Sequence, residues 1–180
     1  DDVFPMTPCS ATDFFEGGKC FLGMTHHLFV WDMFKSICRN SDRLARRALG
    51  LKPRRLFLRP QHVCTPMLKS EVTAIYRLAE EEIMNSFTRT RTSKNLNRYL
   101  FLDYMYLKGK IINERLSKKH FSMGIASARQ LHEFIGKPTH KLTCINDVQL
   151  SDKRYEELQL ALLDAFEHAF PRISKYEVHG

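Results

Sequence analysis

The sequence predicts an α/β fold that is mainly helical, and three observations lead to this prediction. The chain has 180 residues, 43% of them hydrophobic, which is enough for the core of one domain of ordinary size. Several long segments place apolar residues three and four positions apart, which is the period of an amphipathic helix. A few short apolar runs, such as residues 142–145, are instead followed by turn-forming residues and are typical of buried strands.

The first 24 residues are expected to contain one strand end followed by loops and turns. Residues 3–15 should leave a strand and continue as a loop, because Pro5 and Pro8 cannot extend a central strand. Residues 16–24 contain three glycines, which favour tight turns because glycine adopts backbone conformations that other residues avoid.

Two helices are predicted next, over residues 25–40 and 41–50. The first is apolar around most of its circumference, so it should be buried. The Ser-Asp pair at 41–42 can cap the second helix, and Gly50 can end it. Residues 51–62 are basic and contain two prolines, which indicates a loop or a short extended segment.

A longer helix is predicted from Met67, where one apolar stripe recurs at helical spacing. The polar, basic residues 87–95 should form a loop, and residues 96–109 should form a further helix that stops at Gly109. The stripe of the first of these helices consists of Val72, Ile75, Ala79, Ile83 and Phe87.

The C-terminal part begins with residues 111–138, whose mixed pattern gives no assignment. Residues 142–145 are predicted to form a short buried strand that leads into a polar turn, and residues 151–171 give the clearest helix, which Pro171 ends. One face of that helix carries Tyr155, Leu158, Leu162, Phe166 and Phe170.

The chain is basic, with 28 Lys and Arg against 20 Asp and Glu, a formal net charge of +8 and a pI of about 9.4. This charge favours anionic partners such as nucleic acid, a phosphorylated ligand or an anionic membrane face, although many small domains carry such a charge for solubility alone. Five scattered cysteines without a CxxC pair argue against a disulfide framework and a structural zinc site. No apolar run approaches the roughly 18 residues of a membrane span.

Two acidic segments are candidates for holding a divalent cation. Asp1 and Asp2 are adjacent carboxylates beside the predicted strand end, and Asn146 and Asp147 follow the predicted buried strand. Mg²⁺ prefers such hard oxygen ligands and is usually shared with substrate phosphates. From these residues alone, a solvated loop is the favoured interpretation of the first pair, and an Asx turn is the favoured interpretation of the second.

One histidine and two arginines are candidates for the chemistry itself. His62 lies between prolines beside a basic stretch, where it could act as a general base near neutral pH. Arg89 and Arg91 alternate with threonines in the predicted loop, and guanidinium groups suit bidentate contacts with phosphate. The alternatives are a structural histidine and a solvated basic loop. His26 and His27, as neighbours on a predicted helix, should point about 100° apart and not share an ion.

Taken in order, these segments resemble the Stealth family, whose members transfer a hexose-1-phosphate from a nucleotide-sugar. DDVF at residues 1–4 is similar to the end of the second of the family's four conserved regions. HVCTPMLKS at 62–70 and SFTRTRTSKNLN at 86–97 resemble the third region. CIND at 144–147 and AFPRISKYE at 169–177 resemble the fourth.

The resemblance implies that residues 1–180 are a single partial catalytic domain, the C-terminal part of a Rossmann-like (GT-A-like) nucleotide-sugar transferase core. Residues 1–23 would hold the end of the second region with a loop, 51–110 the third region and 140–177 the fourth. It also implies that Asp1 and Asp2 are the cut end of an Asn-Asp-Asp motif. The isolated chain is therefore expected to be inactive as a transferase.

The implied activity of the intact protein is that of the bacterial capsular polysaccharide phosphotransferases. A hexose-1-phosphate, such as N-acetylglucosamine-1-phosphate, would pass from a UDP-sugar to a carbohydrate hydroxyl, with release of UMP, in capsular or cell-surface polysaccharide synthesis. The expected partners are the UDP-sugar, an oligosaccharide or polysaccharide acceptor, and the membrane-associated capsule assembly machinery. The expected location is cytoplasmic, including the inner face of the membrane as a peripheral protein.

The resemblance also assigns roles to the candidate residues. His62 would take the acceptor proton, and Arg91 would bind the transferred phosphoryl group, with Arg89 as a weaker candidate. Asp2 would be catalytic as a ligand of the metal ion. The full set of ligands for Mg²⁺ or Mn²⁺ would be Asp1, Asp2, Asn146 and Asp147.

Two other functions fit parts of the sequence. A basic helical nucleic-acid-binding module could use residues 44–55 together with the aromatic residues. However, these aromatics occur at the spacing of a helical core, so nucleic acid is not the expected partner. A non-catalytic remnant of the same family that only binds the acceptor is the other alternative.

Overall fold

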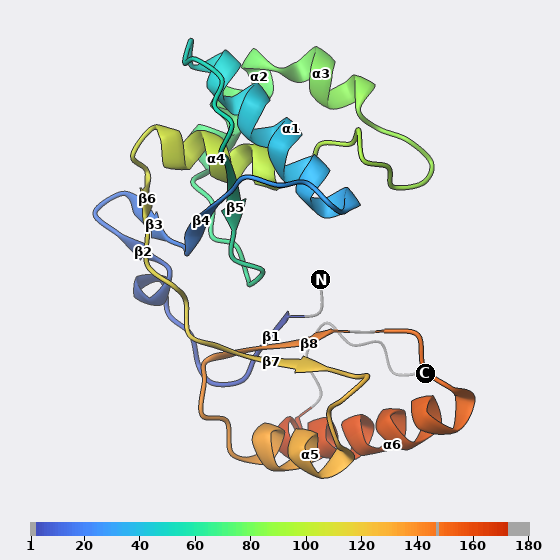
Figure 1. Cartoon of the computed structure of the whole chain (residues 1–180). Coiled ribbons are helices and arrows are strands. Elements are labelled where there is room, and N and C mark those ends of the chain that lie inside the picture. The colour runs from blue at the N-terminus through green and yellow to red at the C-terminus, as the bar shows by residue number, and fades with distance from the viewer. Residues whose placement is uncertain (1–2, 147, 173–180) are drawn as a thin grey trace. The chain divides into compact units, whose positions relative to one another are not determined.

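A computed structural model describes residues 3–146 and 148–172 of the chain, and within them it shows an α/β fold with six α-helices and small mixed sheets (Figure 1). The chain divides into two compact units. Unit 1 comprises residues 1–9 and 117–180, and unit 2 comprises residues 10–116. Asp1, Asp2 and Asp147, three of the four predicted metal ligands, lie outside the described residues.

Unit 1 is built on a three-stranded sheet. Its middle strand is β8 (Leu142–Asn146), with β7 (Lys118–Ser122) parallel on one side and β1 (Val3–Pro5) antiparallel on the other. The first four residues of β8 are all buried. The predictions of a short buried strand at 142–145 and of a strand end near Val3 are therefore confirmed.

Two helices, α5 (Ala128–Gly136) and α6 (Asp152–Ala169), lie side by side and cover one face of this sheet (Figure 1). The prediction of a helix over 151–171 is confirmed by α6. Its predicted apolar face is buried only in part, because Tyr155 and Phe170 are 53% and 51% exposed. The residues of α6 that join the core are Leu158, Leu162, Ala165, Phe166 and Ala169.

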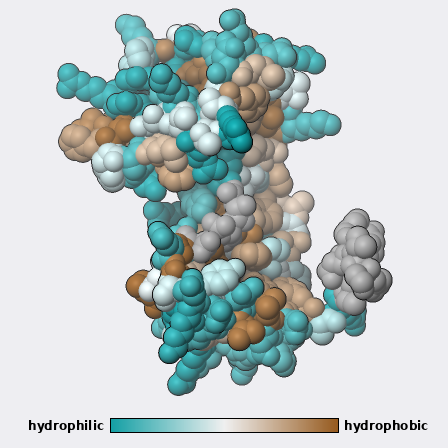
Figure 2. Space-filling model, turned by 90° about the vertical axis from the view of Figure 1, so that its right-hand side faces the viewer, coloured by the Kyte–Doolittle hydropathy of each residue, from teal (hydrophilic) through white to brown (hydrophobic). Residues whose placement is uncertain are grey.

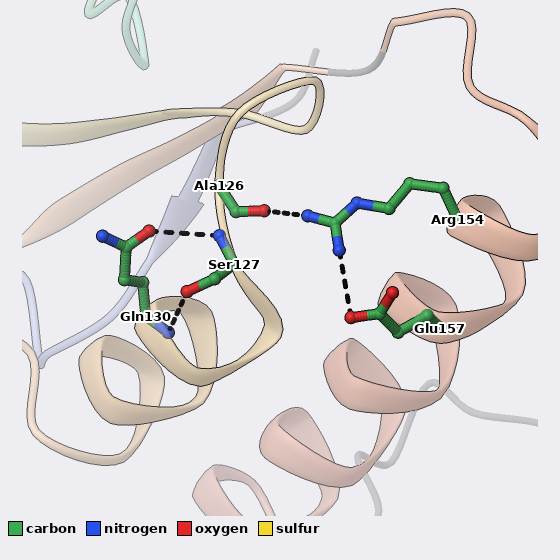
Figure 3. Close-up of polar contacts among 5 residues, drawn as sticks. All are labelled: Ala126, Ser127, Gln130, Arg154 and Glu157. Atoms are coloured by element: carbon green, nitrogen blue, oxygen red, sulfur yellow. Dashed lines mark hydrogen bonds and ion pairs between the residues drawn. The ribbon is translucent and has the colours of Figure 1, made fainter.

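Polar contacts fix the start of α5 (Figure 3). The hydroxyl of Ser127 accepts a hydrogen bond from the Gln130 backbone N–H (3.2 Å), and the Gln130 side chain accepts one from the Ser127 N–H (3.1 Å). This capping box satisfies two backbone donors that a helix start leaves without intrahelical partners. Arg154 of α6 donates to the Ala126 carbonyl and to Glu157 (3.0 Å), so it ties α6 to the start of α5.

Unit 2 contains one long helix, α1 (Met33–Ala48), where the sequence pattern predicts two. Asp32 caps it, because its carboxylate accepts a hydrogen bond from the Lys35 backbone N–H (2.7 Å). The Ser-Asp pair at 41–42, the predicted cap, is buried in the helix interior instead. Gly50 ends this region with a positive φ of 67°, as predicted.

The prediction that the first helix begins at residue 25 is wrong. Residues Met24–His27 form strand β4, which pairs antiparallel with β5 (Phe57–Pro60). Adjacent strand residues project to opposite faces, so it is the strand that separates the imidazoles of His26 and His27. The expected burial is also wrong in part, because the connection to α1 leaves Phe29 and Trp31 68% and 69% exposed.

The helix predicted from Met67 is interrupted at Ala79, whose φ of −134° and ψ of 28° are not helical. It forms α2 (Lys69–Leu78) and α3 (Glu80–Asn85). Ile75, Ala79 and Ile83 of the predicted stripe are buried against α1 and α4 (Tyr99–Leu107). Phe87 is 67% exposed, because α3 ends before it.

The remaining strands of unit 2 form a small sheet in the order β2 (Phe15–Glu16), β3 (Lys19–Phe21) and β6 (Ile111–Ile112). A short 3₁₀ helix, Ala11–Asp13, precedes it. The glycines at 17–18 turn the chain between β2 and β3 with positive φ angles, as predicted from their position. Among the described helices, none has the length and apolar character needed to cross a membrane.

An acidic side chain, Asp103 of α4, is completely buried beside α1. Burial raises its pKa well above the usual range, the neighbouring Asp42 carboxylate raises it further, and Arg46 acts in the opposite direction. Asp42 itself is ion-paired with Arg46 (2.9 Å). Neither carboxylate oxygen of Asp103 has a hydrogen-bond partner among the described residues. The physical arrangement favours a neutral, protonated Asp103 in the folded protein.

We therefore expect the pH dependence of folding stability to change in Asp103→Asn. A folded-state pKa above the unfolded value means that stability is fully present below the unfolded pKa and is lost as pH rises toward the folded pKa. The wild type should lose up to about 1.4 kcal/mol per pH unit relative to Asp103→Asn in that window. Urea unfolding of both proteins between pH 4.5 and 7.5 measures the difference. A difference that stays constant with pH would show that Asp103 is ionised in the folded state.

Candidate functional site

The segment that carries His62 follows β5 directly and is fixed on both sides. The Gln61 backbone N–H donates to the Gly23 carbonyl (2.7 Å). The Gln61 side chain donates to the Leu116 carbonyl (2.9 Å) and accepts from the Leu116 N–H (3.1 Å). Val63 is fully buried on the other side. His62 itself is half-buried, so its neighbours on both sides are fixed while part of the residue stays accessible to solvent.

Gly23 makes this arrangement possible because no side chain fits at that position. A Cβ atom on residue 23 would lie 2.8 Å from the Arg115 side chain and 3.0 Å from the Gln61 side-chain oxygen. Real Cβ atoms essentially never approach other heavy atoms so closely. The glycine thus allows the chain just before β4 to pass close to Gln61, the residue before His62.

Gly23→Ala is expected to destabilise unit 2 by about 1–3 kcal/mol, as overpacking usually does, and to displace Gln61. Gly136→Ala is the matched control, because a Cβ at that helix end meets nothing within 4 Å. The control should be neutral or slightly stabilising, since alanine favours a helix. Urea unfolding measures both variants. Equal stability of the two would show that the contacts around Gly23 relax without penalty.

The loop that carries Arg89 and Arg91 joins α3 to α4 and is closed by Asn95. The Asn95 side-chain amide donates to the Ser86 carbonyl and to the Thr88 hydroxyl (2.9 Å). The Asn95 side-chain oxygen accepts a hydrogen bond from the Thr92 backbone N–H. The prediction of a loop over 87–95 is confirmed, and both arginines are exposed on it.

Arg91 lies against the N-terminal half of α1. Its guanidinium group stands over the Phe34 ring at 5.4 Å, and the Asn40 side chain donates to the Ser93 carbonyl (2.9 Å). The loop is therefore anchored to α1 at two points, one of which orients Arg91. Arg89 is exposed on the same loop.

Three arginines act on the charge of Tyr99, the first residue of α4. Burial raises the pKa of Tyr99, the neighbouring Cys38 raises it further, and the positive charges of Arg98, Arg59 and Arg91 act to lower it. Arg59 belongs to β5, three residues before His62. The strand β5 packs against α1 and α4, and Arg91 lies over the Phe34 ring of α1. The strand that leads into His62 and the helix that orients Arg91 therefore pack together in unit 2.

The positive field around Arg59 extends toward the start of α1. Burial lowers the pKa of His27, and Arg59 and Lys35 lower it further. Lys35 also donates to the Asp32 side chain (2.8 Å) and lies over the Trp31 ring at 3.7 Å. A cluster of cations is an arrangement that binds anions such as phosphate.

Arg59 and Arg98 are members of this cluster that the sequence alone does not single out. The available signal for Arg59 is its place in the basic run that leads directly to His62. Arg98 follows the threonine-rich loop, and its guanidinium lies 5.8 Å from the Tyr99 ring centroid. Both depend on the pairing of β4 with β5 and on the packing of α4, which no local pattern reveals.

In unit 1, Asn146 is the last residue of β8 and is half-buried. It pairs with Ser122 at the end of β7, and its carbonyl accepts a hydrogen bond from the Met123 N–H (3.1 Å). Val3 of β1 pairs with Cys144, and the antiparallel direction puts the N-terminal end of β1 at the carboxyl end of β8. Asn146 thus lies at the sheet edge where β1 begins.

A comparison of the chain with protein-family models and with curated protein sequences finds no match.

Proposed function

We propose that this chain carries the acceptor-activating and phosphoryl-binding part of a hexose-1-phosphate transferase of the Stealth type, with a Rossmann-like core in the intact protein. The reaction is transfer of a sugar-1-phosphate from a UDP-sugar to a carbohydrate hydroxyl, with release of UMP. Its setting is the synthesis of capsular or cell-surface polysaccharide. The observation that carries the proposal is that Arg91 is held over the Phe34 ring of α1, the helix against which the strand that leads into His62 packs.

The chemistry requires a base and a positive environment, and unit 2 supplies candidates for both. The acceptor oxygen forms a bond to the sugar-proximal phosphorus, and the bond from that phosphorus to the oxygen bridging to the uridine phosphate breaks. His62 receives the acceptor proton, and UMP leaves with the electron pair of the broken bond. Arg91 and Arg59 bind the phosphoryl oxygens on which negative charge is spread.

The metal ligands belong to the second part of the proposal. Asn146 offers a hard amide oxygen at the carboxyl end of β8, as Mg²⁺ or Mn²⁺ requires. Asp1, Asp2 and Asp147, the other expected ligands, lie outside the described residues. The ion would neutralise charge on the diphosphate of the donor.

The test is UMP release by the intact protein that carries this chain, with UDP-N-acetylglucosamine, Mg²⁺ and a capsule-type oligosaccharide. Metal-dependent release that requires the acceptor supports the proposal. Acceptor binding without UMP release, across a panel of UDP-sugars, would instead identify a non-catalytic acceptor-binding protein. The 180-residue chain alone is expected to be inactive, and activity of that chain would contradict the proposed contribution of other segments to donor binding.

One observation favours nucleic-acid binding as a second candidate. Arg39, Arg43 and Arg47 recur every fourth residue on α1, so they share one face of the helix. Arg43 borders two surface hollows of about 590 and 730 Å³, and Arg54 and Arg55 line the smaller one. Leu28 and Phe29, both exposed, also line the smaller hollow. Figure 2 shows one face of the molecule, on which brown apolar surface and teal hydrophilic surface are interspersed.

Salt dependence separates the two candidates. A nucleic-acid-binding surface should bind single- or double-stranded DNA. The logarithm of its binding constant should fall steeply and linearly with the logarithm of the salt concentration. Arg39→Gln/Arg43→Gln should reduce that slope by about two, one for each lost phosphate contact. Tight DNA binding with this slope, together with no UMP release, would favour the nucleic-acid candidate over the transferase.

A further inference from the structure

Two histidines and an aspartate from α5 and α6 converge on the surface of unit 1. His132 belongs to α5, and Asp164 and His168 belong to α6. The Nε2 atom of His132 lies 3.1 Å from one carboxylate oxygen of Asp164, and the Nδ1 atom of His168 lies 3.4 Å from the other. One potential ligand atom from each of the three residues lies within 4.8 Å of the other two.

Apolar packing, and not these polar contacts, sets the backbone positions of the three residues. Leu131, which precedes His132, is fully buried, and Ala165, which follows Asp164, is 2% exposed. Asp164 and His168 are four residues apart, so they occupy the same face of α6. The capping box at the start of α5 and the contact from α6 to that cap hold the two helices together (Figure 3). The three side chains therefore extend from a scaffold that is already fixed.

The donor atoms and their spacing suit zinc. Zn²⁺ binds imidazole nitrogen and carboxylate oxygen at about 2.0–2.2 Å, so the ligands of a tetrahedral site lie about 3.3 Å apart. The separation between His132 Nε2 and one Asp164 carboxylate oxygen, 3.1 Å, is close to that value. The Nδ1 atom of His168 lies 2.8 Å from the Asp164 backbone carbonyl, to which it donates, so the nitrogen of His168 that is available to an ion is Nε2. The side chains of His132, Asp164 and His168 are 51%, 57% and 74% exposed. An ion can thus reach all three, and water can occupy the fourth position.

We propose that His132, Asp164 and His168 form a Zn²⁺-binding site that joins α5 to α6. The site differs from the proposed Mg²⁺ or Mn²⁺ site in its residues and in its ligand chemistry, because Mg²⁺ prefers six oxygen ligands. A bound zinc ion links the two helices and stabilises unit 1 by an amount that rises with the logarithm of the free zinc concentration once this exceeds the Kd. This site is independent of the proposed transferase activity.

Zinc binding is measured by calorimetric titration of Zn²⁺ into the metal-free 180-residue chain. The chain carries Cys9→Ser, because an exposed thiol also binds zinc. The expected result is one equivalent of bound Zn²⁺ that excess Mg²⁺ does not displace, and a melting temperature that rises with zinc concentration. His132→Ala and His168→Ala should each weaken binding by about tenfold or more.

His140→Ala is the matched control, because this half-buried histidine of unit 1 contacts Thr139 (2.9 Å) and lies outside the cluster. It should bind zinc as the parent does. Three outcomes would overturn the proposal. The first is zinc binding that persists unchanged in His132→Ala/His168→Ala. The second is thiolate-to-metal charge transfer in the Co²⁺-substituted protein, which would assign the ion to cysteines. The third is absence of zinc binding, which would leave only a surface ion pair.

Discussion

His62→Ala in the intact protein is expected to lower transferase turnover by about 10²–10⁴-fold, the usual contribution of a general base. The imidazole is half-buried and follows Gln61, whose three hydrogen bonds hold the backbone whichever side chain stands at position 62. The fold should therefore survive the substitution. Rates of UMP release, together with thermal unfolding, separate a loss of catalysis from a loss of structure.

The matched control is His26→Ala, which removes an exposed histidine of the same unit. Its turnover should equal that of the wild type. A second readout is the pH–rate profile, because removal of the base should abolish the acidic limb that its protonation produces. If His62→Ala keeps both wild-type turnover and this acidic limb, His62 is not the base.

Removing positive charge from the cluster around Tyr99 should have the next largest effect. Arg91→Gln is expected to lower kcat/KM by about 10²–10³-fold, comparable to the loss of one donor to a transition-state oxyanion. Arg59→Gln should act on the same step, because Arg59 belongs to β5, which packs against the helix that orients Arg91. Two groups that bind one anion are not independent, so the double variant should lose less than the product of the single effects.

Arg77→Gln provides the control, because Arg77 is exposed in the last turn of α2 and its side chain is not part of the cluster. It should leave kcat/KM unchanged. Arg89→Gln tests the assignment within the loop. If this variant loses more activity than Arg91→Gln, the phosphoryl-binding role belongs to Arg89, and the contact between Arg91 and Phe34 is structural. Strict additivity of Arg59→Gln and Arg91→Gln would place the two arginines on different groups of the substrate.

Local sequence patterns correctly predicted the helices and strands whose apolar residues face the core of the folded unit. The strand at 142–145 and the helix over 151–171 combine an apolar run or stripe with clear boundaries, and both are confirmed. Met24–His27 shows how such signals fail. The residues fit a helical pattern, but hydrogen bonding to β5, which is distant in sequence, makes them a strand. The prediction that Ser41 and Asp42 cap a second helix is wrong for a related reason. Residues that make good caps also occur inside a buried helix, and these two lie inside α1.

The residues of the candidate site likewise fall into those that the sequence could predict and those that it could not. The type of residue and its loop could be predicted for His62 and Arg91, because prolines and alternating threonines mark those loops in the sequence. Arg59 could not be predicted, since its position near Tyr99 depends on the pairing of β5 with β4 and on packing against α4. The pairs Asp1–Asp2 and Asn146–Asp147 stay a prediction, because only Asn146 of the four lies among the described residues.

The division of unit 1 into two distant pieces of sequence has a consequence for the order of folding. Unit 2 is one continuous segment, so it can fold as soon as that segment is complete. The sheet of unit 1 needs β1 from one end of the chain and β8 from the other, and joining them closes a loop that contains all of unit 2. Contacts of such high sequence separation form slowly. During synthesis, β1 must therefore wait without its partner strand until most of the chain has been made.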